Sequence, residues 1–305
     1  MSPVTTVGAM PRALLAKRLA QGLHLQTGPF ITCVRTSIDV VVDGIARLYA
    51  DYPVSDAGYA DFRLTLAPPP GLRRWFRPQV CAEFDLPSHF LPMPRAHAFA
   101  MFEWMMNWCI SSRVNHYLII HAAVVERGGR AVILPAPPGS GKSTLCAILV
   151  NAGWRLLSDE LALVDPESGM LIPAPRPISL KNQSIDVVRR LVPSAVMSPP
   201  AHDTLKGSVA HWKAPSDSVA RADEPAMPAW VIYPRYQAGA ALALQRLPKA
   251  RSMMRLAENG FNYSELGAAG FEALGDLIER CDSYDFSYSV IDEAVAAFEQ
   301  LLGSP

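Results

Sequence analysis

A short glycine-rich segment is the part of the sequence whose residue types and spacing point most directly to chemistry. Residues 136–144 read APPGSGKST, follow an apolar stretch typical of a strand and precede a stretch with helical periodicity. This is the phosphate-binding pattern G-x-x-x-x-G-K-[ST], with Ala136 in place of the first glycine. Alanine fits there if its φ is negative. Gly139 and Gly141 would let the backbone turn so that successive N–H groups point at phosphate oxygens.

Two side chains at the end of this loop would bind the ATP phosphates and magnesium. In such loops the lysine, here Lys142, reaches the β- and γ-phosphates, and the hydroxyl of Ser143 can ligate Mg²⁺. The N-terminus of the following helix adds a partial positive charge. The residues expected to bind ATP are Pro138, Gly139, Ser140, Gly141, Lys142, Ser143 and Thr144.

An acidic pair follows the next apolar run. Ser158, Asp159 and Glu160 follow the apolar run 154–157, and Asp159 lies 17 residues beyond Lys142. Parallel strands of one sheet end on the same side, so the loops that follow them face one crevice. A kinase needs one carboxylate near the acceptor hydroxyl and another on the metal. The alternative is an acidic turn between two strands without a chemical role.

A histidine precedes both motifs. His121 lies in an apolar stretch, between Ile119-Ile120 and Ala122-Ala123, 21 residues before Lys142. A single histidine in an apolar strand is more often a core residue with its hydrogen bonds satisfied. Its interest comes from its position relative to the loop and the acidic pair.

Taken together, these segments resemble the catalytic domain of the HPr kinase/phosphorylase family. The resemblance lies in His121-Ala-Ala-Val124, the glycine pair at 128–129, the loop at 136–144 and the segment Leu156–Glu160. The family shows a His-Gly strand, a G-x-x-G-x-G-K-S loop and a Leu-Val-Ala-Asp-Asp segment at matching intervals. The resemblance covers about residues 117–182 and is absent from the N-terminal stretch.

The C-terminal part is similar to the HprK-related kinase branch of this family. The similar features are Phe261-Asn-Tyr263, Cys281-Asp-Ser-Tyr284 and an acidic, amphipathic last helix. The resemblance implies an α/β fold, with a P-loop catalytic domain like those of HPr kinase and the phosphoenolpyruvate carboxykinases, at residues 113–305. Residues 1–112 would form a small N-terminal α/β domain of unknown role.

The resemblance also implies an activity and a set of roles. The protein would be an ATP- and Mg²⁺-dependent kinase that transfers the γ-phosphoryl group to a serine of a protein or peptide. Asp159 would accept the serine proton, His121 would support the acidic pair and Lys142 would bind the phosphates. Ser143 and Glu160 would hold the metal. Homo-oligomers are possible, because true HPr kinases form hexamers.

Three departures from the family pattern support a second hypothesis, an ATP-binding regulatory or assembly module with little transfer activity. Ala136 and Ala122 replace glycines, and Glu160 stands where the family prefers aspartate. The later signature that the bifunctional enzymes use for phosphorolysis is not recognisable, so phosphorylase activity is not expected. Phosphorylation of a small molecule is a third possibility, although the N-terminal stretch favours a macromolecular partner.

Several basic residues are weaker candidates. Arg176 and Lys181 could contact phosphate or acceptor, or lie at the surface. Lys206, His211 and Lys213 belong to the proline-rich stretch 193–228, where periodicity fades and a lid or solvated loop is expected. The other expected elements are strands at 30–35, 62–66, 80–84, 118–125, 131–134, 155–164, 230–233 and 242–247, and helices at 38–49, 96–110, 143–152 and within 250–302.

The composition excludes several classes of protein. The 305 residues include 28 basic and 28 acidic side chains, and half are hydrophobic, so neither a disordered chain nor one that coats nucleic acid is expected. The five cysteines are scattered without a CxxC pair, which is typical of free thiols in a reducing compartment. No apolar run approaches the roughly 18 residues of a membrane helix. We therefore expect a cytoplasmic protein that binds neither nucleic acid nor membranes.

Overall fold

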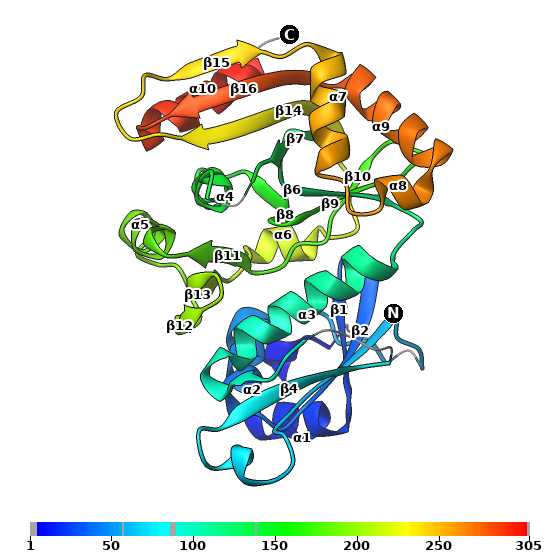
Figure 1. Cartoon of the computed structure of the whole chain (residues 1–305), viewed down its shortest axis with the longest axis vertical. Coiled ribbons are helices and arrows are strands. Elements are labelled where there is room, and N and C mark those ends of the chain that lie inside the picture. Colours follow the sequence, from blue (N-terminus) through cyan, green and yellow to red (C-terminus); the bar gives the residue numbers. More distant parts are fainter. Residues whose placement is uncertain (1–4, 57, 86–89, 138, 304–305) are drawn as a thin grey trace.

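The computed structural model describes residues 5–56, 58–85, 90–137 and 139–303. Pro138, one of the residues expected to bind ATP, lies outside these ranges. The described chain has a mixed α/β fold with three sheets of five, eight and three strands (Figure 1). Within those ranges, no helix has the length and apolar character needed to cross a membrane.

The five-stranded sheet is built from the N-terminal third of the chain, and its strands follow in the order β1-β2-β3-β4-β5. Helix α2 connects β2 to β3, which are parallel, whereas the other neighbours are antiparallel. Helix α3 lies between this sheet and the rest of the molecule (Figure 1). The elements are α1 (Arg12–Gln21), β1 (Leu23–Thr27), β2 (Phe30–Thr36), α2 (Asp39–Leu48), β3 (Phe62–Ala67), β4 (Gln79–Phe84), β5 (Met93–Pro94) and α3 (Ala98–Arg113), with short 3-10 helices at Val7–Ala9, Leu72–Arg74 and Arg95–His97.

The eight-stranded sheet has the order β10-β9-β6-β7-β14-β16-β15, and β8 pairs with β6 beyond this path. Gly128 and Gly129, with φ of 62° and 80°, make the tight turn between β6 and β7 that positive φ at both positions allows. Its strands are β6 (Leu118–Arg127), β7 (Arg130–Pro135), β8 (Arg155–Ser158), β9 (Leu161–Val164), β10 (Leu171–Ile172), β14 (Met227–Tyr236), β15 (Ala243–Arg246) and β16 (Asp282–Tyr288).

The three-stranded sheet, of order β11-β13-β12, is antiparallel. Its strands are β11 (Ile178–Lys181), β12 (Ala201–Thr204) and β13 (Gly207–Trp212). The remaining helices are α4 (Lys142–Asn151), α5 (Gln183–Leu191), α6 (Ser216–Ala220), α7 (Lys249–Glu258), α8 (Tyr263–Leu266), α9 (Ala268–Arg280) and α10 (Ile291–Gly303).

The structure corrects the expected elements at three places. The segment 155–164, expected as one strand, is two strands, β8 and β9, separated by the acidic pair. The stretch 193–228 contains β12, β13 and α6 rather than a structureless loop, because pairing with β11 and burial of Trp212 supply order that local periodicity does not signal. Strand β16 replaces part of the expected helical region and pairs in parallel with β14.

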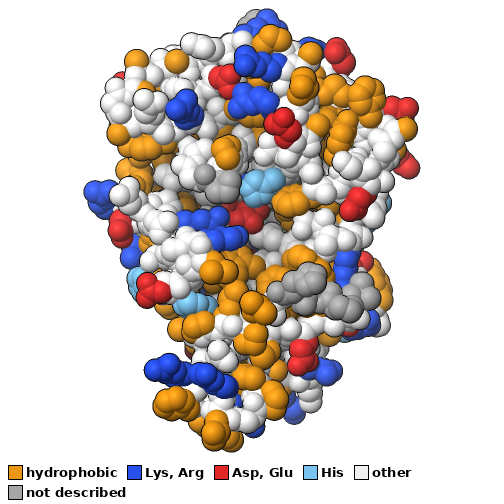
Figure 2. All heavy atoms as spheres, in the orientation of Figure 1, with side chains coloured by type: hydrophobic (Ala, Val, Ile, Leu, Met, Phe, Trp, Pro, Cys, Tyr) orange, Lys and Arg blue, Asp and Glu red, His pale blue; other side chains and the backbone are white. Residues whose placement is uncertain are grey.

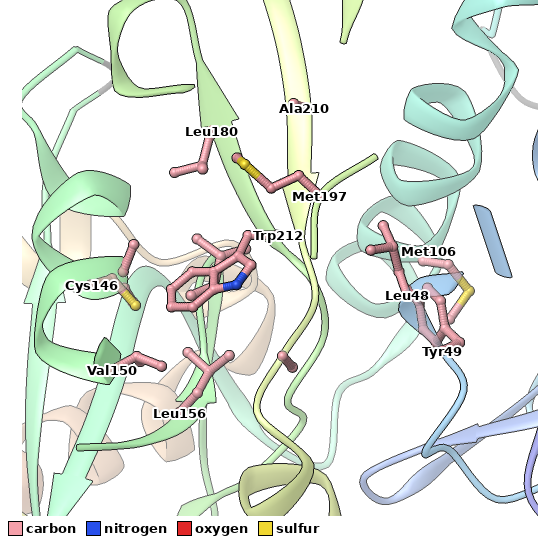
Figure 3. Close-up of a cluster of buried hydrophobic side chains, with 14 of the residues drawn as sticks. Leu48, Tyr49, Met106, Cys146, Val150, Leu156, Leu180, Met197, Ala210 and Trp212 are labelled. Carbon is pink, nitrogen blue, oxygen red and sulfur yellow. The ribbon is translucent and has the colours of Figure 1, made fainter. Parts of the chain in front are cut away.

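One cluster of buried apolar side chains joins the two predicted domains. In Figure 3, Trp212 of β13 lies beside Cys146 and Val150 of α4, while Tyr49, which follows α2, and Met106 of α3 lie on the far side of the three-stranded sheet. All five residues belong to one continuous core. The five-stranded sheet uses only residues before 113, and the other two sheets use only residues after it. The sheets are thus divided between the two predicted domains, but the apolar core is continuous across both. The division into two domains therefore stays a prediction.

Candidate functional site

The register of β6 brings the three predicted motifs to one place. Strand β6 runs antiparallel to β7, β8 and β9. Its pairs include His121 with Leu161, Ala122 with Pro135 and Val124 with Ser158. Strands β7 and β8 therefore end on the same side, and the loops that follow them lie beside the histidine. Figure 2 shows histidine, acidic and basic side chains close together near the middle of this face.

The glycine-rich loop needs both of its glycines. Gly139 and Gly141 have φ of 86° and 90°, a region that side chains strain. A Cβ at Gly141 would lie 2.9 Å from Tyr236 Cβ, whereas one at Gly139 would meet open space. Ala136 is buried and is not among the described residues with positive φ, so alanine is compatible with its position. The open surface at Gly139 and the start of α4 at Lys142 suit an anionic ligand.

Lys142 is held by the predicted histidine. Its side chain is buried, and its Nζ lies 3.2 Å from His121 Nε2. Burial lowers the pKa of Lys142. Burial and the nearby Lys142 ammonium lower the pKa of His121 to about 4, so its ring is neutral at pH 7. The neutral Nε2 therefore accepts a hydrogen bond from the ammonium, which leaves two of its three donors for a ligand.

Among the described residues, the hydrogen bonds of Asp159 are made by one of its two carboxylate oxygens. Its Oδ2 accepts hydrogen bonds from Ser179 N, at 2.9 Å, and from Ser143 Oγ, at 3.3 Å. Its Oδ1 is buried and has no hydrogen-bond partner among the residues that the structure describes. Burial raises the pKa of Asp159, although the charge of Lys142 opposes the rise. The structure thus places the predicted base against the predicted magnesium ligand.

Glu160 is bound by residues from two other elements. Asn107 Nδ2 donates to its Oε2 at 2.7 Å, and Lys181 Nζ lies 3.8 Å from its Oε1. Burial alone would raise the pKa of Glu160, but the positive charges of Lys142, Lys181 and Lys206 hold it below its ordinary value. The carboxylate is therefore ionised at neutral pH.

A buried polar network that the sequence did not indicate supports Glu160 from α3. Arg176 donates to Asn107, and its Nη1 lies 3.5 Å from Glu103 Oε2. Tyr49 Oη donates to Glu103 Oε1 at 2.8 Å. Asn107 and Glu103 give no signal in the sequence, because they lie in an apolar helix that is remote in sequence from the motifs. The guanidinium of Arg176 thus contacts other side chains of the protein and is not a solvated surface group.

The other basic residues that were weaker candidates lie in different surroundings. Lys181 lies beside Glu160, and Lys206 Nζ lies 5.2 Å from the centre of the Trp104 ring. His211 is buried, with its ring edge-on to that of Phe99. Lys213 forms an ion pair with Asp51, 2.7 Å away. Lys181 is therefore the candidate from this group that contacts the acidic pair.

Glu103 should make stability depend on pH. Burial raises its pKa from 4.5 to about 7, so the folded protein retains a proton that the unfolded chain releases as pH rises above 4.5. The free energy of unfolding should therefore fall as pH increases between about 4.5 and 7. We expect Glu103→Gln to lack roughly 2 kcal/mol of the decrease that the wild type shows between pH 5 and pH 7.5. Urea unfolding of both proteins at the two pH values measures this difference, and equal decreases would contradict it.

Oxygen atoms are the donors that this site could offer to a metal ion. Among the residues that the structure describes, no group of three or more His, Cys, Asp or Glu side chains could hold a metal ion. Ser143 Oγ and Asp159 Oδ2 lie 3.3 Å apart, and Glu160 follows Asp159 in the chain. Mg²⁺ is usually held by one or two carboxylates together with substrate phosphates and water. Oxygen atoms of this kind could contribute to holding Mg²⁺ together with a nucleotide.

In a comparison with known protein families, a family model matches the part of the chain that contains these residues. The family model described as SynChlorMet cassette protein ScmC matches residues 94–178, which is less than half of the chain. The matched segment includes α3, His121, the glycine-rich loop and the acidic pair. No curated protein matches the chain.

Proposed function

We propose that this protein is an ATP- and Mg²⁺-dependent kinase that transfers the γ-phosphoryl group to a serine of a protein or peptide. The observation that carries the proposal is the contact between Ser143 and Asp159 beside the Lys142–His121 hydrogen bond. These two contacts bring together the three motifs that resemble those of HPr kinases. In this proposal residues 113–305 are a P-loop catalytic domain of the HPr kinase and phosphoenolpyruvate carboxykinase type, and residues 1–112 are a small α/β domain.

Each side chain has a distinct part in this chemistry. Lys142 and the loop N–H groups bind the phosphates, with His121 fixing the ammonium in place. Ser143 and Glu160 hold Mg²⁺, which supplies positive charge that offsets the charge on the phosphates. Asp159, whose pKa burial raises, accepts the proton of the acceptor hydroxyl. The five cysteines are free thiols, which fits a protein of the reducing cytoplasm.

Labelled phosphate transfer to a partner tests the proposal. The matching family is described as a cassette protein, so proteins encoded beside this chain are the first acceptors to try. We expect γ-labelled ATP to label one of them, with the phosphate mapped to serine by mass spectrometry. Phosphate on a small molecule alone would contradict a macromolecular acceptor.

An ATP-binding regulatory or assembly module is the second candidate function. Glu160 already binds Asn107 and lies beside Lys181, which reduces its capacity as a metal ligand. This hypothesis predicts that ATP promotes partner binding while no phosphorylated product forms. Pull-down with and without ATP, followed by mass spectrometry of the partner, separates the two functions.

Replacing His121 should test its role toward Lys142. His121→Leu removes the acceptor at 3.2 Å from Nζ, so we expect ATP affinity to fall roughly 2- to 12-fold, as for loss of one ordinary hydrogen bond. His121→Gln keeps an acceptor and should bind ATP nearly as the wild type does. Because the pKa of His121 is about 4, the wild type and His121→Gln should show parallel ATP affinities from pH 6 to pH 8. Equal affinities for His121→Leu and the wild type, measured by calorimetry, would contradict this role.

A further inference from the structure

A small cavity lies against Asp159. Its walls come from α3, from the end of β8, from the segment before β11 and from β13. Its volume is about 10 Å³, which is room for about one water molecule. The cavity therefore takes a group no larger than a hydroxyl without rearrangement.

Three buried polar atoms of residues that line this cavity have no hydrogen-bond partner within the part of the chain that the structure describes. They are Asp159 Oδ1, Ser179 Oγ and His211 Nε2, and their residues are 5%, 7% and 2% exposed. Buried polar groups are nearly always hydrogen-bonded, and a buried water typically makes about three such bonds. Three unpaired atoms around a space of this size point to a bound hydroxyl oxygen.

The chemistry of the three groups is complementary to a hydroxyl. The Asp159 carboxylate can only accept a hydrogen bond when ionised, whereas the Ser179 hydroxyl can donate one. Burial lowers the pKa of His211 to about 3, so its ring is neutral at pH 7 and Nε2 can carry a proton to donate. A hydroxyl would thus donate to Asp159 and accept from Ser179 or His211.

The two oxygens of Asp159 have different surroundings, and this difference indicates which hydroxyl occupies the cavity during the reaction. Oδ2 is occupied by Ser143 on the side of the nucleotide loop and by the Ser179 backbone. A general base must lie within hydrogen-bond distance of the proton it removes, so Oδ1 is the oxygen left for the acceptor. Oδ1 belongs to a residue that lines the cavity.

We propose that this cavity is the subsite for the acceptor hydroxyl, with Ser179 and His211 as its positioning residues, and that a water molecule fills it in the free protein. The assignment to the acceptor rests on the proposed kinase function, whereas the water does not. The hydroxyl oxygen forms a bond to the γ-phosphorus of ATP, the bond from that phosphorus to the β–γ bridging oxygen breaks, and ADP leaves with the electron pair. The hydroxyl proton passes to Asp159 Oδ1.

The small volume also predicts the class of acceptor. A serine side chain ends in a hydroxymethyl group, which suits a space for one oxygen. Tyrosine would have to place a ring where Trp104 and Pro177 form the wall. The subsite should therefore favour a serine peptide over the same peptide with tyrosine.

A crystal structure of the free full-length chain and kinetics of three variants test the subsite. We expect a water within hydrogen-bond distance of Asp159 Oδ1, Ser179 Oγ and His211 Nε2. Ser179→Ala keeps the backbone N–H to Asp159 and should lower kcat/KM for the acceptor roughly 2- to 12-fold, with ATP affinity unchanged. His211→Leu should act similarly, and His211→Gln, which keeps a polar group, should recover part of the loss.

Ser283→Ala is the matched control. Ser283 in β16 is 2% exposed and its hydroxyl also has no partner in the described ranges, but it does not line this cavity. This variant should leave both ATP affinity and acceptor kinetics unchanged. An empty or collapsed cavity would overturn the bound water, and unchanged kcat/KM in both Ser179→Ala and His211→Leu would overturn the acceptor subsite. A wild type that transfers no phosphate would instead remove the proposed function, while the crystal structure still decides on the water.

Discussion

Lys142→Met should weaken ATP binding by roughly 10- to 150-fold, the effect of losing one hydrogen bond to a charged group. Lys142 is the cation at the start of α4, and its hydrogen bond to His121 leaves donors for phosphate. Methionine fills the same space without charge. Calorimetric titration with ATP and Mg²⁺ measures the loss. Lys249→Met, which removes an exposed lysine paired with Glu279, is the control and should bind ATP normally.

The same substitution should not destabilise the free protein. Burial lowers the pKa of Lys142, which means that the folded state disfavours the charged form relative to the unfolded chain. At pH 7, below the ordinary pKa of lysine, this lowers the free energy of unfolding, and methionine removes the effect. We expect Lys142→Met to unfold at the same or a higher urea concentration. Lost ATP affinity together with lower stability would show that the variant affects the fold rather than the ligand.

The motifs could be predicted from the sequence because they lie on neighbouring strands of one sheet. A strand, a glycine-rich loop, a helix and a strand follow one another from Ala131 to Ser158, and their order alone places the loop and the acidic pair on one side of the sheet. His121 adds to them through the pairing of β6 with β9. Each of these relations depends on local pattern or on a rule of sheet topology.

The groups that surround the acidic pair could not be predicted, because they depend on contacts between distant elements. Asn107 reaches Glu160 from α3, 53 residues earlier in the chain, and Ser179 reaches Asp159 through its backbone, which no residue type signals. His211 lies in a stretch whose composition suggested a loop, but β13 is ordered by its pairing with β11. Tertiary packing determines these positions.

Asp159→Asn should leave ATP affinity within about twofold of the wild type and lower phosphoryl transfer by roughly 10²- to 10⁴-fold, the contribution of a general base. Asparagine keeps the shape of the side chain and an oxygen that accepts from Ser179 N and Ser143 Oγ, so the loop should keep its geometry. It cannot take a proton from the acceptor. Asp165→Asn, which changes an exposed aspartate bonded to Ser168, is the matched control and should transfer normally.

The dependence of transfer on pH should identify Asp159 more specifically than the size of the loss. Burial raises its pKa above the ordinary 3.8, so the fraction of ionised base in the wild type should fall as pH drops through this raised value. Wild-type transfer should fall with it, and the residual transfer of Asp159→Asn should lack that decrease. Full transfer by the variant, or the same acidic decrease in both proteins, would contradict the role of Asp159.

Stability gives a second, independent signature of the same residue. With its pKa raised in the folded state, ionised Asp159 lowers the free energy of unfolding at pH 7, and the effect disappears as pH falls below the ordinary pKa. Asp159→Asn should therefore be at least as stable as the wild type at pH 7. A residue whose removal abolishes transfer without loss of stability acts in chemistry rather than in folding. Lys142 and Asp159 are oppositely charged and both buried. Burial of each charge lowers the free energy of unfolding, and the ligand that the two residues are proposed to bind would explain why the protein retains them.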